Sequence, residues 1–348
     1  MPQSMTNKER AAQLRVLIGD IKQNQQDFNA ATRSFGAGIH DLLCTLEAQA
    51  SADDQYRRPN SIWYNDGSVI LVAQGTGFKV HQSVLSQHST VFLDLIETAS
   101  LRWSSLGTLV VMVSDYVDDL SIFLKVLYNP GNDSYFKMPN TPAPIEWVSA
   151  LIKLGKKYQV KFIFDEAVSR LKSVHPRTYA EYKLMRGAMS NHISDYPNGE
   201  MAITIINLAR AHNLPNLLPF AFYLCCQLPL ETIMHGVKRN DGTAEKLSSD
   251  DIMRCLKGRE QLTLMNASLV QTLRSYMPSM NKCNAHKCDS RWVSVVCGDS
   301  PLSPKLMGYN FRDWEIGFCK RCKKAYRRIV EDAREKTFPM FSDIFELN

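Results

Sequence analysis

Residues 66–96 read DGSVILVAQGTGFKVHQSVLSQHSTVFLDLI, and this stretch decides the predicted fold. Residues 69–72 are four consecutive apolar side chains, a pattern that indicates a strand buried on both faces. The glycines of residues 74–77 permit the positive φ angles of a turn. Residues 78–80 then predict a second strand, so the first half of the stretch predicts a β-hairpin.

Two short helices are predicted after the hairpin. His81 and Ser83 stand where a helix N-cap is expected, and Ser89 repeats that signal. After Ser89, apolar residues occupy positions i, i+1, i+4 and i+5 of one helix face: Val91, Phe92, Leu95 and Ile96. A strand, a turn, a strand and two short helices therefore follow one another within a single short stretch.

This ordered set of residues resembles the BTB/POZ domain, and most closely the branch of that family found in fungi. The pattern is carried by Asp66, Gly67, residues 69–72, Gly75, Phe78, Val80, His81, Val84, Leu85, Ser89 and Phe92. It continues through residues 110–113, 118–128 and 151–158, so the resemblance covers about residues 60–175. The resemblance implies a protein-interaction module that is commonly dimeric and has no catalytic activity of its own.

The order of segments predicts an α+β chain with four regions. Residues 1–58 are predicted to form an N-terminal amphipathic helix and a linker, and residues 59–175 the BTB/POZ α/β module. Residues 176–280 are predicted to be an all-helical extension, and residues 281–348 a small, Cys-rich, zinc-stapled region. The extension resembles the region that follows BTB domains in many adaptor proteins.

Prolines and the periodicity of apolar residues predict where the remaining loops, strands and helices begin and end. Residues 100–107 and 129–144 are predicted loops, and residues 109–113 another buried strand. In the extension, Pro197, Pro215 and Pro229 separate the candidate helices. Cys225, Cys226 and Cys255 lie on apolar faces and are expected to be small buried side chains.

The N-terminal region has a seven-residue repeat. Its repeating positions hold Leu14, Ile21, Phe28, Phe35 and Leu42. One interpretation is a coiled-coil partner helix. The other is a helix that folds back on its own protein or is partly ordered, which the glycines at 36 and 38 favour because they interrupt the repeat.

Composition does not indicate a disordered, membrane-spanning or secreted protein. The chain of 348 residues is 45% hydrophobic and 22% charged, as is ordinary for globular protein, and its net charge of +6 does not by itself indicate nucleic acid. It has no run of eighteen apolar residues, and its N-terminus lacks the apolar segment of a signal peptide. The sequence therefore predicts a cytoplasmic or nuclear protein that does not associate with membranes.

The C-terminal cysteines have the spacing of metal ligands. Cys319 and Cys322 form a CxxC pair, and Cys283 and Cys288 form a CxxxxC pair. A structural Zn²⁺ site needs four N or S ligands in a tetrahedron, which these four cysteines can supply. The sequence therefore predicts a structural zinc site, in which His286 or Cys297 is an alternative for one ligand.

The spacing of these cysteines allows three other interpretations. The first is four unrelated thiols in a reducing compartment, which the presence of two pairs disfavours. The second is a catalytic zinc, for which no glutamate is suitably placed as a base. The third is a redox-active CxxC, which would be expected at the start of a helix after a strand in a thioredoxin-like unit.

A basic run follows the second cysteine pair. Residues 320–328 are rich in lysine and arginine and include Tyr326, a composition that suggests nucleic-acid contact. Glu331, Asp332 and Glu335 follow on the same predicted helix and can pair with the basic residues at i, i+4 spacing. The expected outcome is a solvated helix face, and DNA contact is the alternative.

The predicted function is that of a non-enzymatic adaptor. His81 is expected to be a hydrogen-bonded structural residue, because no Ser–His–acid or Cys–His spacing surrounds it. The resemblance implies a homodimer that binds client proteins, with a cullin-type ubiquitin ligase as one candidate partner. The alternatives are a nuclear transcription or chromatin regulator that contacts DNA through its basic Cys-rich C-terminus, and a lone oligomerisation scaffold.

Overall fold

The computed structural model describes residues 8, 12, 15, 56–59, 62–98, 102–104, 107–129, 143–187, 201–238, 244–276, 304 and 319–347. The chain divides into two compact units, one made of residues 1–137 and 150–165 and the other of residues 138–149 and 166–348. The predicted N-terminal helix lies outside the described residues, except for Lys8, Ala12 and Arg15, which are helical. Most of the predicted loop at 129–144 also lies outside them.

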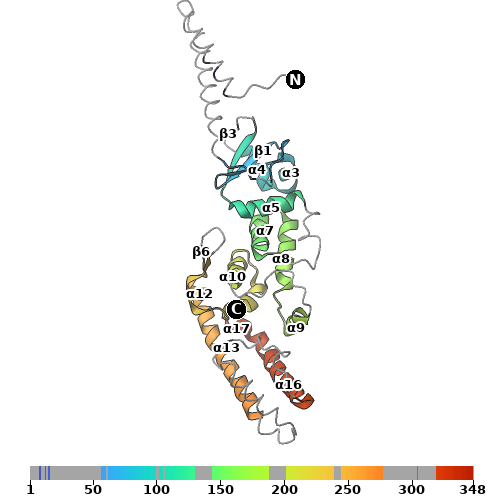
Figure 1. Ribbon diagram of the computed structural model, residues 1–348, viewed down its shortest axis with the longest axis vertical. Coiled ribbons are helices and arrows are strands. Elements are labelled where there is room, and N and C mark those ends of the chain that lie inside the picture. Colours follow the sequence, from blue (N-terminus) through green and yellow to red (C-terminus); the bar gives the residue numbers. More distant parts are fainter. Residues whose placement is uncertain are drawn as a thin grey trace, which may run out of the picture. The chain divides into compact units, whose positions relative to one another are not determined.

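The first unit contains a four-stranded sheet (Figure 1). Its strands are β1 (Val69–Ala73), β2 (Thr76–Val80), β3 (Arg102–Trp103) and β4 (Leu109–Val113). The order across the sheet is β2-β1-β4-β3, with β1 antiparallel to β2 and parallel to β4. The predicted hairpin and the strand at 109–113 are therefore confirmed, but the prediction that this strand is buried holds only for its first three residues. The prediction of a continuous loop at 100–107 was wrong, because β3 pairs with β4 there.

The central strand β1 is buried along its whole length, as predicted. Ile70 and Val72 share one face of the sheet with Val110 of β4, and Tyr56 and Trp63 pack against this group. Aromatic side chains from the segment before the sheet therefore cover the face that would otherwise meet solvent. This cover explains why the strand is continuously apolar and does not alternate.

The turn between β1 and β2 is shorter than predicted. Gln74 and Gly75 both have positive φ, 45° and 75°, as a two-residue type I′ turn requires. Thr76 and Gly77 belong to β2 and pair with Ala73 and Val72. The I′ turn matches the twist of the strands and allows pairing to continue up to the turn itself.

The helices described between residues 82 and 173 are α3 (Gln82–His88), α4 (Thr90–Thr98), α5 (Val117–Tyr128), α7 (Ile145–Lys157) and α8 (Lys161–Ser173). Ser89 caps α4 as predicted, because its Oγ accepts a hydrogen bond from the amide of Phe92 at 3.0 Å. His81 occupies the N-cap position of α3 but makes no side-chain capping bond. The amide of Gln82 instead donates to Oγ of Ser68 at 2.9 Å, so the cap comes from a residue before β1.

The second unit is mainly helical. Its elements are α9 (Tyr179–Gly187), α10 (Met201–Ala211), η1 (Pro215–Leu217), α11 (Leu218–Cys225), α12 (Leu230–His235), β5 (Val237–Lys238), β6 (Ala244–Glu245), α13 (Ser249–Tyr276), α16 (Lys320–Thr337), η3 (Phe338–Met340) and α17 (Phe341–Ile344). The prediction of an all-helical extension was wrong, because β5 and β6 form a two-stranded antiparallel sheet. Gly236 makes this possible: its φ is 81°, and a Cβ there would lie 2.2 Å from the carbonyl oxygen of Glu245.

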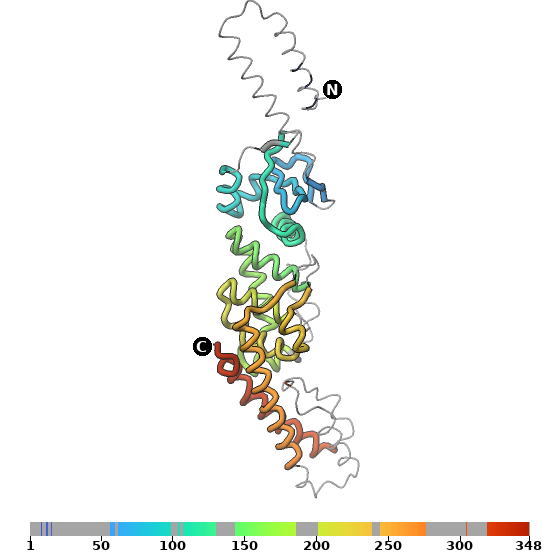
Figure 2. Tube along the Cα trace, turned by 90° about the vertical axis from the view of Figure 1, so that its left-hand side faces the viewer, coloured from blue at the N-terminus to red at the C-terminus, as the bar shows by residue number. Residues whose placement is uncertain are grey.

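Aromatic side chains from the C-terminus form part of the core of this unit. The ring of Phe341 stacks on Tyr223 with centroids 5.0 Å apart, and Phe345 stacks on Phe222 at 5.4 Å. α13 and α16 run next to each other, as Figure 2 shows in orange and red. Cys225, Cys226 and Cys255 are buried, as predicted. Among the described residues, no helix is both long enough and apolar enough to cross a membrane.

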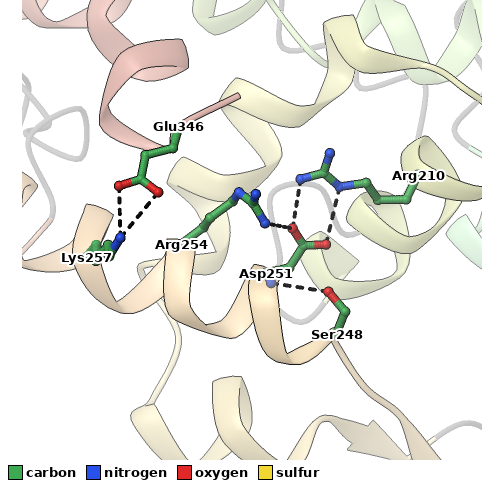
Figure 3. A network of polar contacts seen from close by, with 6 residues as sticks. All are labelled: Arg210, Ser248, Asp251, Arg254, Lys257 and Glu346. Carbon is green, nitrogen blue, oxygen red and sulfur yellow. Dashed lines mark hydrogen bonds and ion pairs between the residues drawn. The ribbon is translucent and has the colours of Figure 1, made fainter. Parts of the chain in front are cut away.

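A network of charges fixes the start of α13 (Figure 3). The buried carboxylate of Asp251 pairs with Arg210 of α10 at 2.8 Å and with Arg254 at 3.4 Å. The amide of Asp251 also donates to Oγ of Ser248 at 3.2 Å, which satisfies a donor in the first turn. Asp251 therefore links α10 to α13 and helps to cap α13 at the same time.

Buried His175 gives this unit a testable pH dependence. Its Nδ1 lies 2.8 Å from the carbonyl oxygen of Leu171, so Nδ1 carries the proton, and its ring stands edge-on to Phe220. Burial lowers the pKa of His175 from 6.5 to about 4. Between these pH values the unfolded chain binds the proton and the folded chain does not, so stability is full above pH 6.5 and falls as the pH drops. We expect the free energy of unfolding to decrease by about 3 kcal/mol over this interval.

The measurement is chemical denaturation of the full chain at several pH values. His175→Phe should remove this part of the pH slope, whereas His88→Gln, which changes an exposed histidine, should keep it. Equal slopes in the wild type and in His175→Phe would contradict the prediction.

Candidate functional site

The outer edge of β2 is covered by the segment that precedes the sheet. The amide of Arg57 donates to the carbonyl of Gly75 at 2.7 Å, and the amide of Gly77 donates to the carbonyl of Arg57 at 2.9 Å. Further along, the amide of Tyr64 donates to the carbonyl of Lys79 at 3.0 Å. These bonds occupy backbone groups of an edge strand that could otherwise pair with another chain.

Tyr158 is the central polar residue of the first unit. Its hydroxyl donates to the buried carboxylate of Asp115, which also accepts from Nζ of Lys157 at 2.5 Å. The carbonyl of Tyr158 accepts from Oγ of Ser89 at 2.6 Å, and its ring stacks on Phe92 with centroids 3.9 Å apart. Burial, together with the nearby Asp115 carboxylate, raises the pKa of Tyr158. Tyr158, at the end of α7, therefore contacts the segment before α5 through its hydroxyl and the start of α4 through its carbonyl and ring.

His81 belongs to a second polar cluster, and it is hydrogen-bonded as predicted. Its amide donates to the hydroxyl of Tyr128 at 2.6 Å, and its Nε2 lies 3.2 Å from the carboxylate of Asp66. The ring of Tyr64 stacks on Tyr128 at 4.7 Å. Burial raises the pKa of Tyr128 to about 12, and the hydrogen bond from His81 lowers the pKa of Asp66. Tyr128 therefore stays protonated near neutral pH. Through these hydrogen bonds the cluster links the residue after β2 to the end of α5.

Large apolar side chains are exposed where β4 ends. The side chain of Met112 is 56% exposed and that of Tyr116 is 42% exposed. Val110 and Val111, earlier in the same strand, are buried. Met112 lies in β4 and Tyr116 is the residue before α5, so two large apolar side chains face solvent close together in the sequence.

The CxxC pair lies at the beginning of α16. Cys319 is the N-cap residue, and its Sγ lies 3.3 Å from Sγ of the buried Cys322. The pair therefore stands at the start of the helix that the sequence predicted to carry the basic run. Cys283, Cys288, His286 and Cys297 lie outside the described residues. Within the residues that the structure does describe, no group of three or more His, Cys, Asp or Glu side chains could hold a metal ion.

The basic run occupies the first half of α16. The acidic residues predicted to neutralise it have other partners: Glu331 accepts from Tyr179 and lies 3.4 Å from Arg334, and Asp332 pairs with Lys336 at 2.8 Å. Both ion pairs are formed with cations in the second half of the helix. Pairing at i, i+4 spacing does occur in α16, between Asp332 and Lys336, and neither of these two ion pairs includes a cation of residues 320–328.

The sequence located some of these residues and missed others. It singled out His81, Ser89 and the CxxC pair from their local spacing. It did not single out Asp115 or its pairing with Tyr158, because the two residues are separated by 43 positions and neither belongs to a recognisable motif. The exposed apolar pair was also missed, because residues 109–113 look uniformly buried in the sequence.

Comparison with known families identifies one of the domains. Residues 67–174 match the family model described as the BTB/POZ domain. The match does not distinguish the fungal branch from others, and no curated protein matches the chain. BTB domains are generally interaction modules, not enzymes, and they typically dimerise and bind partner proteins. The chain therefore contains a BTB/POZ domain, at residues 67–174.

Proposed function

We propose that this protein is a non-enzymatic adaptor that self-associates through its BTB/POZ domain and binds a client protein through another part of the chain. The observation that carries the proposal is the BTB/POZ domain itself, with its fully buried central strand and its exposed Met112 and Tyr116. Most of the second folded unit lies beyond the matched domain, at residues 175–348, and this part is proposed to bind a separate partner.

Sedimentation equilibrium of the full chain at micromolar concentrations tests self-association. A dimer is the expected result, and a monomer at every concentration would contradict the proposal. Met112→Glu places a charge on the exposed apolar pair without touching the core. Loss of the dimer in this variant would assign the pair to the dimer surface, whereas an unchanged dimer would leave it for a different partner.

We further propose a cullin-type ubiquitin ligase scaffold as one partner, a suggestion that rests on the family resemblance. The test is binding of the purified full chain to a purified cullin by surface plasmon resonance. Substitutions at Leu85 or Phe92 are unsuitable, because both side chains are fully buried and their loss would disturb the fold. Met112→Glu is the better variant for locating the cullin-binding surface, because Met112 is exposed. If the wild-type protein does not bind the cullin at micromolar concentrations, this partner is excluded.

Two other functions are alternatives. A lone oligomerisation scaffold would self-associate but bind no cullin. A nuclear regulator would retain duplex DNA through the basic first half of α16, with a strong dependence on salt. The first is decided by the two binding experiments above, and the second by measuring DNA binding at two salt concentrations.

We also propose that Cys319 and Cys322 are two of the four ligands of a structural zinc ion, with Cys283 and Cys288 as the others. The fit of the described pair supports this, because Zn–S bonds of about 2.3 Å in a tetrahedron place two sulfur atoms about 3.8 Å apart. The two Sγ atoms, now 3.3 Å apart, would need to separate only slightly. A bound ion would fix the start of α16 to the segment that contains the other pair.

The purified full chain is therefore expected to contain about one zinc per chain by atomic emission spectroscopy. Cys319→Ser should abolish this content, because three ligands hold the ion far more weakly, whereas Cys44→Ser should leave it unchanged. Equal zinc in the wild type and in Cys319→Ser would contradict the proposal. Corresponding changes at His286 and Cys297 test whether either replaces one of the four cysteines.

A further inference from the structure

One face of α16 carries a row of exposed cations in its first half. Lys320, Lys324 and Arg328 are spaced four residues apart and therefore lie along one face of the helix, with Arg321 beside them. All four side chains are exposed. The opposite face, which includes Tyr326 and Val330, is buried within the second unit.

This arrangement of charge is unfavourable for the helix itself. The N-terminal end of a helix carries a partial positive charge, so cations there are destabilising and acids would be favourable. The first turn of α16 contains no acidic residue. Within the described part of the chain, the four cations of the row form no ion pair. Ion pairing within the described residues therefore does not account for the row, which is available to an external anionic partner.

An open pocket lies directly beside this row. It occupies about 590 Å³ between α13 and α16. Met265 and Leu269 of α13 and Ile329 of α16 supply its apolar lining. Arg328 lines the same pocket, so the last cation of the row stands at the edge of an apolar recess. A volume of this size is in the range of pockets that accept one or more large side chains of a ligand.

We propose that the row and the pocket together bind an acidic peptide segment of a partner protein that carries a large apolar anchor residue. The row would attract the carboxylates, and the anchor would fill the pocket between α13 and α16. This inference rests on the proposed adaptor function and gives the client-binding surface a location and a chemistry.

Two other polyanions fit the site less well. A nucleic-acid backbone would satisfy the cations but would leave the apolar pocket empty, and Tyr326, the aromatic residue within the basic run, is fully buried and cannot stack on a base. An anionic membrane is usually bound by a basic helix whose apolar face enters the lipid. The apolar face of α16 is instead packed inside its own unit.

The test begins with the full chain and a phage-displayed library of random dodecapeptides. Selection on the wild-type protein is paired with removal of phage that bind Lys324→Glu/Arg328→Glu. The enriched peptides are expected to combine several acidic residues with one large apolar residue. A fluorescein-labelled copy of the most enriched peptide and a labelled DNA duplex are then the probes for fluorescence polarisation.

Three variants separate the contributions to binding. Lys324→Glu/Arg328→Glu should weaken peptide binding at least tenfold. Ser268→Trp, which projects a large side chain into the pocket from an exposed position of α13, should also weaken it at least tenfold. Lys161→Glu/Lys172→Glu changes two exposed lysines of α8 and alters the net charge equally, so it should bind as the wild type does. Circular dichroism confirms that each variant is folded.

The proposal is overturned if no acidic peptide is enriched, or if the two site variants bind as tightly as the α8 variant. Duplex DNA that binds more tightly than the peptide, with no effect of Ser268→Trp, would overturn it in favour of nucleic acid. Self-association through the BTB/POZ domain is measured in the same samples by sedimentation. Failure of the peptide site therefore remains distinct from failure of the adaptor function.

Discussion

Phe92→Ala is expected to lower the free energy of unfolding of the BTB/POZ unit by about 3–5 kcal/mol. The ring is fully buried and stacks almost parallel on Tyr158, with an interplanar angle of 10°, and it also contacts Phe123. Its removal would leave a cavity beneath the polar cluster of Tyr158 and Asp115. Hydrogen exchange of peptides from β1 and β4 in the full chain measures the loss in this unit.

Phe162→Ala is the matched control, because it deletes the same side chain at a position that is 42% exposed. Phe162 makes an edge contact with His88, and its loss should cost less than about 1 kcal/mol. If the two substitutions cost the same, Phe92 does not lie in the centre of the core and the arrangement around Tyr158 is wrong.

Arg334→Ala is expected to destabilise the second unit by about 3 kcal/mol or more. The guanidinium is fully buried, and it pairs with Glu331, which also accepts a hydrogen bond from Tyr179 of α9. Without Arg334, the carboxylate of Glu331 loses its buried cation, and the space that the long side chain filled becomes a cavity. The Glu331 side chain is 33% exposed, so water recovers part of the loss.

Lys336→Ala provides the control on the same helix. Lys336 and Asp332 form an ion pair too, at i, i+4 spacing and 2.8 Å, but both side chains are exposed. Its removal should cost no more than about 0.5 kcal/mol. Thermal unfolding of the two variants, followed by hydrogen exchange of α16, compares them. Equal effects would mean that burial does not control the strength of these pairs.

Local chemistry in the sequence was sufficient for the elements that short-range interactions define. Residues 69–72 predicted a strand because four apolar side chains in succession need cover on both faces. Ser89 predicted the start of a helix because its hydroxyl can accept a backbone amide three residues later. Prolines fixed several helix ends, because they lack an amide and restrict the preceding residue.

The short β-strands were not predicted from the sequence. β3, β5 and β6 have two residues each, which is too short for an alternating pattern. Each exists because a neighbouring strand supplies hydrogen bonds, and β5 with β6 also needs Gly236 for its close backbone approach. The helix that follows the CxxC pair was predicted, but its packing against α13 was not.

The sequence by itself therefore determined the hairpin, the positions of the long helices, the buried cysteines and the residues of the BTB/POZ domain. Only the tertiary structure decided which side chains meet: Asp115 with Tyr158, Glu331 with Tyr179 and Arg334, and the C-terminal aromatic rings with α11. It also decided that Glu331 and Asp332 of α16 pair with Arg334 and Lys336. The physical reason is the distance along the chain over which each kind of interaction acts. Backbone preferences and caps act over a few residues, whereas burial and ion pairing depend on groups that chain folding brings together from distant positions.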